Sequence, residues 1–209
     1  MRKSILTSLF MLASGFAFSQ DMSKLFGTQE FVWCGLDFSM VRCIGSEGFT
    51  DPQAVKEKFF SDWNNLVLSE ADKYNFKEPY KKTTQTNDLS VVTRRNELPD
   101  YKTFIINEPY SFEEGQLKKI IADYNLKEAK DGLGLVYVYE TLNKTKGHAV
   151  VNLVFFDITS KEIIWTKRYE APAGGFGFRN FWARTILETM KLSEKDYKKA
   201  LKTYEKSMK

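Results

Sequence analysis

Residues 133–170 read LGLVYVYETLNKTKGHAVVNLVFFDITSKEIIWTKRYE and carry the strongest secondary-structure signal in the chain. Three runs in this stretch are rich in Val, Ile, Tyr, Phe and Trp: Leu133 to Leu142, His148 to Asp157 and Lys161 to Glu170. Links of only five and three residues join these runs. Because β-rich runs with short turn-forming links are typical of consecutive hairpins, the stretch predicts an antiparallel three-strand meander.

The region before the meander begins with a strand and a helix. Leu36, Phe38 and Met40 alternate with polar residues, which is typical of a half-buried strand. Asp51 and Pro52 form a helix start, because Asp is a good N-cap and Pro is tolerated at the first helical position. The apolar residues that follow recur every three or four positions, so they predict a helix with one apolar stripe.

The remaining patterns complete a fold of the α+β class. Residues 89–93 indicate a strand, and Ser111 with Glu114 forms a capping box for a helix. Two helices end the chain, one from Arg179 to Lys191 and one capped by Ser193, which spans 193–208. We therefore expect a single domain whose helices pack on one face of a mixed sheet, in which the C-terminal meander is antiparallel.

The N-terminus has the pattern of a secretory signal peptide. A basic start is followed by an apolar run from Ile5 to Phe18 and by small residues before Gln20. The run is shorter than the roughly 20 residues that a membrane helix needs, so no membrane span is expected. The pattern predicts cleavage near Ser19/Gln20, with residues 1–19 as the signal peptide, 20–209 as the domain, and a periplasmic or secreted location.

Charge is distributed unevenly along the chain. The net charge of +4 falls to +2 without residues 1–19, and Lys191 to Lys209 alone carry +4, so the body carries −2. A slightly acidic body lacks the basic surface that nucleic-acid binding requires. The lysine-rich terminal helix is interpreted as a solvated face.

The two cysteines, Cys34 and Cys43, lie nine residues apart. In one extended strand they would be about 30 Å apart and on opposite faces, whereas a disulfide needs Cα atoms within about 7 Å. Only a chain reversal near Gly35 would bring them together. We expect two buried free thiols.

Three motifs carry a resemblance: Gly35-Leu36-Asp37-Phe38-Ser39, the Phe156–Glu162 link with its following Ile-Ile-Trp strand, and residues 174–182 (GGFGFRNFW). With them the chain resembles a set of exported proteins of Gram-negative bacteria without a characterised activity. It is also similar to small envelope α/β domains that serve as accessory or assembly subunits. The resemblance implies architecture and compartment, and no chemistry.

The sequence predicts no catalytic residue, metal site or cofactor. His148 is the only histidine, and neither a Gly-x-Ser-x-Gly elbow nor a Cys-x-x-Cys pair is present. Asp37 is the one candidate for an acidic site, because it lies on the polar side of its strand and could pair with a second carboxylate. The alternative interpretation of Asp37 is a buried or turn-bonding carboxylate.

The glycine-rich turn is the candidate ligand-binding site. Gly174, Gly175 and Gly177 place flexible backbone before a helix, whose free N–H groups and dipole attract anions. Arg179 adds a charged donor, and four aromatic residues supply flat apolar surface: Phe176, Phe178, Phe181 and Trp182. The alternative interpretation is a strand-to-helix turn with its aromatic side chains in the core. Either way, the turn needs a positive φ at Gly174 or Gly175.

These patterns favour an exported, non-enzymatic envelope protein that serves as a binding or assembly module. The expected partner is an envelope protein or an anionic ligand. The alternative is a carboxylate-dependent enzyme that acts on cell-wall glycan or another polymer.

Overall fold

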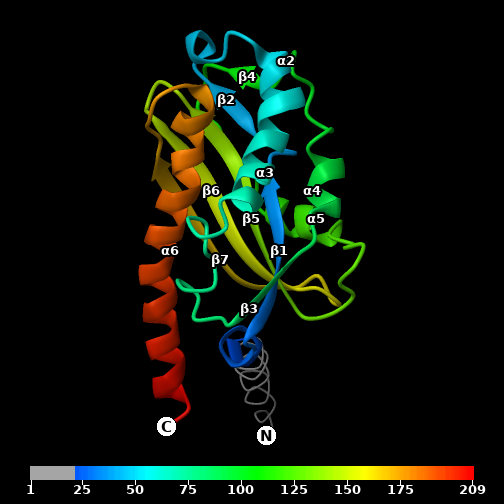
Figure 1. Ribbon diagram of the computed structural model, residues 1–209, viewed down its shortest axis with the longest axis vertical. Helices are drawn as coiled ribbons and strands as arrows, with labels where there is room; N and C mark the ends of the chain where they lie inside the picture. Colours follow the sequence, from blue (N-terminus) through cyan, green and yellow to red (C-terminus); the bar gives the residue numbers. More distant parts are fainter. Residues whose placement is uncertain (1–21) are drawn as a thin grey trace, which may run out of the picture.

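The computed structural model describes residues 22–209, and a sheet of seven strands lies at their centre (Figure 1). The predicted signal peptide and its cleavage site lie outside the described residues. The strands are β1 (Glu30–Asp37), β2 (Arg42–Ile44), β3 (Thr84–Asn87), β4 (Ile105–Ile106), β5 (Leu133–Asn143), β6 (His148–Asp157) and β7 (Ile163–Pro172). The main helices are α2 (Pro52–Ala54), α3 (Phe60–Ser69), α4 (Ser90–Arg95), α5 (Gln116–Ala122) and α6 (Phe178–Ser207). A π-helical turn, Val55–Phe59, joins α2 to α3, and residues 22–27 are also helical.

The predicted fold class needs correction, because parallel pairing dominates the N-terminal side of the sheet. Strands β1 and β3, β1 and β5, β2 and β5, and β2 and β4 all pair in parallel. Antiparallel pairing is restricted to β5–β6 and β6–β7. Parallel neighbours need long crossover connections, and no short-range pattern in the sequence reveals them.

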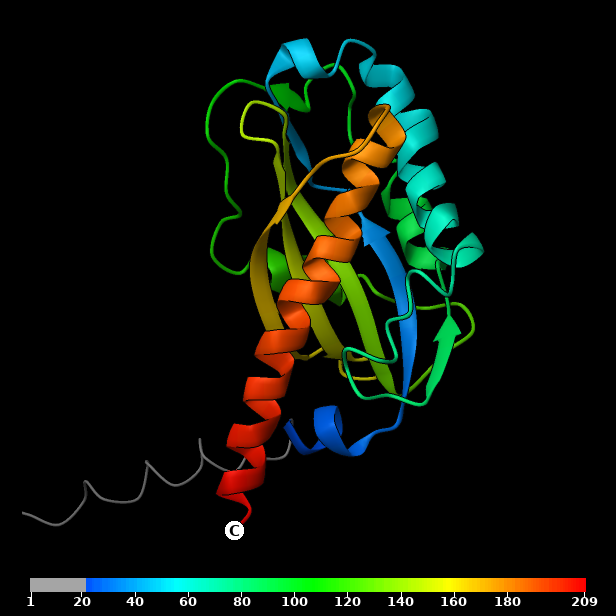
Figure 2. The same cartoon turned by 60° about the vertical axis from the view of Figure 1, so that its left-hand side comes forward.

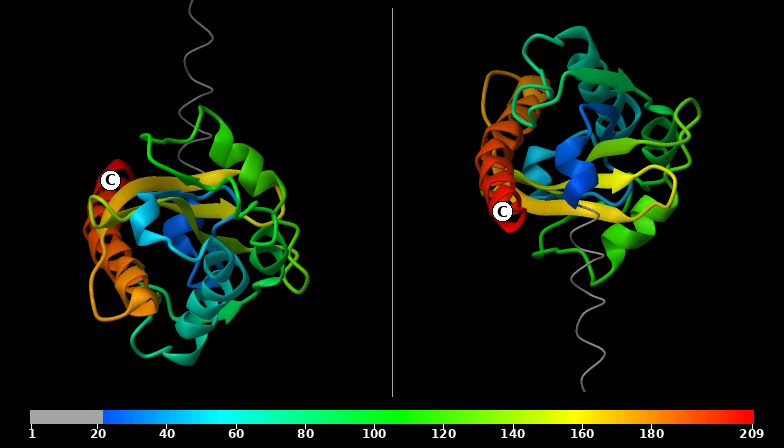
Figure 3. Two further views of the ribbon diagram at one scale, coloured as in Figure 1. Left: turned by 90° about the horizontal axis from the view of Figure 1, so that it is seen from above. Right: turned by 90° about the horizontal axis from the view of Figure 1, so that it is seen from below.

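The helices cover both faces of the sheet, so their expected position on one face is wrong. On one face, α3 and α6 pack on a large apolar cluster that includes Tyr137 and Phe155. On the other face, α4 and α5 pack on a smaller cluster that includes Val136 and Phe156. The curved sheet lies between these two sets of helices when the molecule is seen end-on (Figure 3).

Strand β5 explains why both faces need a cover. All of its eleven residues are buried, and it pairs with β1 and β2 along one edge and with β6 along the other. A nearly continuous apolar sequence is typical of a strand that is buried on both sides. Gly134 makes room for the ring of Phe156, which lies only 2.4 Å from the place of a Cβ atom at this position. A side chain at Gly134 would displace that ring.

Four local predictions differ from the structure. The half-buried strand expected at Leu36, Phe38 and Met40 is the buried end of β1, which stops at Asp37, and Met40 lies in a turn. Residues 89–93 lie mostly in helix α4, because the Asp88 carboxylate accepts a hydrogen bond from the backbone N–H of Ser90 at 3.1 Å and starts the helix. Helix α5 begins at Gln116 after Gly115, so Ser111 does not cap it. The two expected C-terminal helices are one helix, α6. Other local predictions are confirmed: Asp51 caps α2 by accepting from the N–H of Ala54 at 2.9 Å.

Candidate functional site

Three turns meet at one end of the sheet, and we call this region the loop end. They are residues 45–48 after β2, residues 144–147 after β5, and residues 173–177 between β7 and α6. The Lys144 N–H donates to the Ile44 carbonyl at 2.9 Å, and the Ala173 N–H donates to the Gly147 carbonyl at 2.9 Å. These backbone bonds join all three turns at the upper end of the molecule in Figure 1.

The glycine-rich turn is fixed by its own backbone. The Gly174 N–H donates to the Phe181 carbonyl at 2.9 Å, and the Phe181 N–H donates to the Gly177 carbonyl at 2.9 Å. Gly175 has φ 113° and Gly177 has φ 79°, and residues other than glycine rarely adopt a backbone conformation with such a positive φ. The expectation of a positive φ is therefore confirmed for Gly175, whereas Gly174 does not adopt one.

Phe176 is the most exposed large apolar side chain among the described residues. It lies between Gly175 and Gly177, and 96% of its surface is exposed. Most other aromatic side chains near the turn are packed: Phe178 contacts Phe59 at 4.8 Å between ring centroids. The sequence pattern groups Phe176 with Phe178, Phe181 and Trp182, and only the structure shows which of the four is almost fully exposed.

The structure separates the residues of the predicted ligand site. Trp182 is 2% exposed and stacks on Phe49 at 5.6 Å, so its ring belongs to the core. Arg179 is exposed, and among residues 22–209 its guanidinium forms hydrogen bonds only with the side-chain oxygen of Asn180, at 3.4 Å. Its backbone carbonyl accepts from Trp63 Nε1 at 2.9 Å. The backbone of Arg179 is thus anchored while its charge faces solvent.

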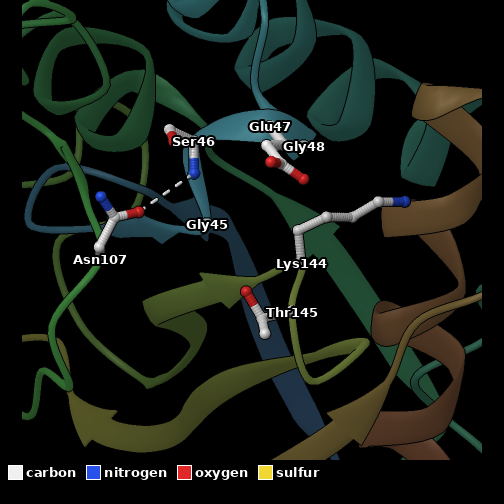
Figure 4. Close-up of a pocket in the computed structure, with 7 residues that line it drawn as sticks. All are labelled: Gly45, Ser46, Glu47, Gly48, Asn107, Lys144 and Thr145. Carbon is white, nitrogen blue, oxygen red and sulfur yellow. Dashed lines mark hydrogen bonds between the residues drawn. The ribbon is translucent and has the colours of Figure 1, made fainter.

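Lys144 adds a positioned charge that the sequence did not identify. Its ammonium lies 3.6 Å above the ring of Phe181, which is a favourable cation–π geometry. Its Cγ lies 2.1 Å from the place of a Cβ atom at Gly48, so the absence of a side chain there lets Lys144 cross toward α6 (Figure 4). Lys144 could be recognised only once β5 and α6 were known to meet at this end.

A hollow of about 500 Å³ lies beside Lys144 and opens to solvent. Three segments line it: the glycine-containing turn after β2, the β5–β6 turn and the loop after β4 (Figure 4). The lining residues are Gly45, Ser46, Glu47, Gly48, Asn107, Lys144 and Thr145. Asn107 accepts a hydrogen bond from the Ser46 N–H at 3.4 Å. The hollow is polar and carries one acidic and one basic side chain.

Asp37, the alternative acidic site, ends β1 inside a buried polar network. Its Oδ2 accepts from Arg95 Nε at 2.9 Å and from the Tyr124 hydroxyl at 2.6 Å, and its Oδ1 accepts from the Ser39 N–H at 2.8 Å. Arg95 also donates to the Ser39 hydroxyl at 2.8 Å and to Asp123 at 2.7 Å. We call these five residues the Asp37 network.

Four members of the Asp37 network are buried, and only the side chain of Asp123 is exposed. The exposed fraction of Asp37 is 0%, whereas a general acid or base must come within hydrogen-bond distance of its substrate. Burial and the Asp37 carboxylate raise the pKa of Tyr124 well above its usual value, so the phenol keeps the proton that it donates. The arrangement fixes the end of β1 against α4 and the segment after α5.

Both cysteines are buried free thiols, as expected. Cys34 lies in the apolar cluster under α4 and α5, and Cys43 lies in the cluster on the opposite face. Burial raises the pKa of both thiols, so neither is a reactive thiolate.

Among the helices of residues 22–209, none has an apolar stretch of the length that a membrane span requires. Within the same residues, no group of three or more His, Cys, Asp or Glu side chains could hold a metal ion.

No protein-family model and no curated protein matches the chain. Among solved structures, the chain is similar to the LpoB C-terminal domain from Salmonella enterica. The identity is 11%, the match covers 75% of this chain and 93% of that domain, and the TM-score is 0.28. At this TM-score and identity the likeness establishes neither a shared fold nor a shared function.

Proposed function

We propose that this chain is an exported, non-enzymatic module that binds a component of the cell envelope through its loop end. The observation that carries the proposal is Phe176, which is 96% exposed on a turn held by backbone hydrogen bonds. Burying a phenylalanine side chain is worth about 1.5–3 kcal/mol. A monomer that exposes such a residue at a fixed position keeps that free energy available for a partner.

The fixed backbone of the turn favours binding. Ordering a loop on association costs free energy, and a turn that is already ordered avoids much of this cost. Aromatic and arginine side chains are enriched in the parts of interfaces that carry most of the affinity. Phe176 and Arg179 supply these two residue types at the start of α6, and the Lys144 ammonium adds a charge from the neighbouring turn.

The surroundings of Phe176 favour a partner with acidic groups. Within residues 22–209, neither Arg179 nor Lys144 has a carboxylate within ion-pair distance. An envelope protein with an acidic, apolar surface would pair with both charges while it covers Phe176. A free anionic ligand would engage the charges and leave Phe176 exposed.

Export is the second part of the proposal, and it rests on the sequence of residues 1–20. Mass spectrometry of the protein from its native cells should show a chain that begins at or near Gln20. A soluble protein that retains Met1 would contradict export without affecting the proposed binding surface.

The alternative function, a carboxylate-dependent enzyme acting on cell-wall glycan, gains no support from Asp37. Both of its carboxylate oxygens accept hydrogen bonds within the fold, and the side chain does not reach the surface.

The proposed binding can be tested by replacing its anchor. Native complexes would be trapped in cells with a reversible crosslinker and separated by size, with the wild type, Phe176→Ser and Leu98→Ser compared. Leu98 is a matched control, because it is 65% exposed and lies outside the loop end. We expect Phe176→Ser to lose the complex and Leu98→Ser to retain it. A complex that forms equally well with both variants would contradict the proposal.

A further inference from the structure

The C-terminal half of α6 carries a row of lysines that the loop end does not involve. We call it the lysine stripe, and its members are Lys191, Lys195, Lys198, Lys199, Lys202 and Lys206. With about 100° of rotation per residue, all six lie within an arc of about 100° on the helix. All six are exposed. The stripe is about 22 Å long at 1.5 Å per residue.

The opposite side of α6 fixes the direction in which the stripe points. Tyr197 is buried in the large apolar cluster, and Tyr204 packs against it. The ring of Phe26, from the helical residues 22–27, lies 5.3 Å from that of Tyr197 and 5.2 Å from that of Tyr204. Because these contacts hold the apolar side of α6 inward, the lysine stripe on the opposite side faces away from them. Figure 2 shows that the C-terminal part of α6 extends past the end of the sheet.

Within the described part of the chain, only two of the six charges in the lysine stripe are paired with a carboxylate. Lys191 pairs with Glu188 at 3.2 Å, and Lys198 pairs with Glu194 at 2.5 Å. The other four lysines have no carboxylate within ion-pair distance in the described part of the chain. Each member also has another lysine three or four residues away, and like charges at this spacing destabilise a helix. An external anion would remove this repulsion.

We propose that the lysine stripe binds the surface of an anionic membrane. Lysine presents a compact charge on a flexible stem, whereas directional recognition of carboxylates and phosphates favours arginine. The stripe holds no arginine, and clusters of four to eight basic residues on an amphipathic helix match the diffuse charge of anionic lipid headgroups. A nucleic acid fits less well, because the body of the chain carries −2.

The position of the stripe leaves the loop end free. Helix α6 has 30 residues and is about 45 Å long. It starts beside Gly177 at the loop end, and the lysine stripe occupies its distal half. Membrane binding through the stripe therefore does not require the surface around Phe176, and this inference does not depend on the proposed function.

A vesicle experiment tests the inference. The chain from Gln20 onward would be sedimented with phosphatidylcholine vesicles that either contain or lack phosphatidylglycerol. We expect co-sedimentation only with the anionic vesicles, and release when the ionic strength rises from about 0.1 M to about 1 M, because salt screens charges at this range. A wild-type chain that stays in solution with anionic vesicles would overturn the inference, and an acidic protein would then be the remaining partner for the stripe.

Matched variants distinguish vesicle binding through the lysine stripe from an effect of the overall positive charge. The stripe variant replaces Lys195, Lys199, Lys202 and Lys206 with Gln, and the control variant replaces four exposed lysines elsewhere, Lys77, Lys102, Lys118 and Lys119. We expect the stripe variant to bind anionic vesicles about tenfold more weakly or worse, and the control to stay within about twofold of the wild type. Equal losses in the two variants would overturn the inference. The stripe variant should melt no lower than the wild type, because its substitutions relieve repulsion.

Discussion

In the Asp37 network a carboxylate, a guanidinium and a phenol bond to one another, and Asp37 and Arg95 are almost completely buried. At the loop end, Arg179 and Lys144 have no carboxylate partner among residues 22–209, and Phe176 has almost no contact. Charged and aromatic side chains thus stabilise the fold in the Asp37 network, whereas at the loop end they are exposed and available to a partner. Most buried polar groups find their partners inside the fold, so charged and apolar side chains that a fixed surface exposes to solvent are the better guide to function.

The largest expected effect is in the Asp37 network. Asp37→Ala removes the buried partner of the Arg95 guanidinium and leaves only the exposed carboxylate of Asp123 to pair with it, so it should lower the free energy of unfolding by about 3–5 kcal/mol. Denaturant unfolding measures this change. Asp123→Ala is the control, because the Asp123 side chain is 64% exposed and should cost at most about 1 kcal/mol. Similar costs for the two variants would contradict the special contribution of the buried Asp37 carboxylate to stability.

A smaller effect is expected from the glycine-rich turn. Gly175→Ala places a side chain at φ 113° and should cost about 1–2 kcal/mol. Gly174→Ala is the control, because Gly174 has no positive φ and its nearest neighbour is the flexible end of Arg184, at 2.9 Å. Thermal unfolding of both variants tests whether the turn is held in one conformation. If Gly175→Ala is as stable as the wild type, the turn is not fixed and Phe176 is not preorganised.

The smallest change in stability is expected for Arg179. Arg179→Ala should alter the free energy of unfolding by less than about 0.5 kcal/mol, as exposed charges usually do. If the loop end binds anions, the same variant should lose the rise in melting temperature that a phosphate-, carboxylate- or glycan-bearing ligand produces in the wild type. Arg184→Ala is the control, because Arg184 already pairs with Glu188 at 3.4 Å. A wild-type melting curve that no such ligand shifts would exclude a free anionic ligand at the loop end and leave the protein partner as the remaining candidate.

Local features were the part of the fold that could be predicted from the sequence. The three β-rich runs lie in β5, β6 and β7, and Asp51 starts a helix, because turns and caps depend on neighbouring residues. The parallel pairing of β1 with β3 and β5 could not be predicted, since it joins segments that are far apart in the chain. Helices on both faces follow from that pairing.

The candidate site shows the same limit. The positive φ of Gly175 was predictable, because a strand must turn sharply into a helix there. The burial of Trp182 and the exposure of Phe176 were not, because both are aromatic residues near one helix start and only the packing of α6 distinguishes them. Lys144 comes from another turn, and its place beside Phe181 depends on the tertiary structure.

Ser193 shows how a local signal can mislead. A serine before an apolar stripe predicts an N-cap, yet Ser193 is buried within α6. Its hydroxyl donates to the Met190 carbonyl at 3.0 Å and lies 2.7 Å from the Tyr80 hydroxyl. Serine can form such bonds inside a helix as well as at its start, so only the tertiary partner decides between the two roles.

The most direct test of the account is site-specific photo-crosslinking in the native cells. A photoreactive phenylalanine analogue would replace Phe176 in one strain and Leu98, which is 65% exposed outside the loop end, in another. A loop end that binds an envelope protein should give one discrete crosslinked product from position 176, which is absent from position 98 and weakened when Arg179→Ala is added. No product from position 176, or the same product from both positions, would contradict a binding function of the loop end.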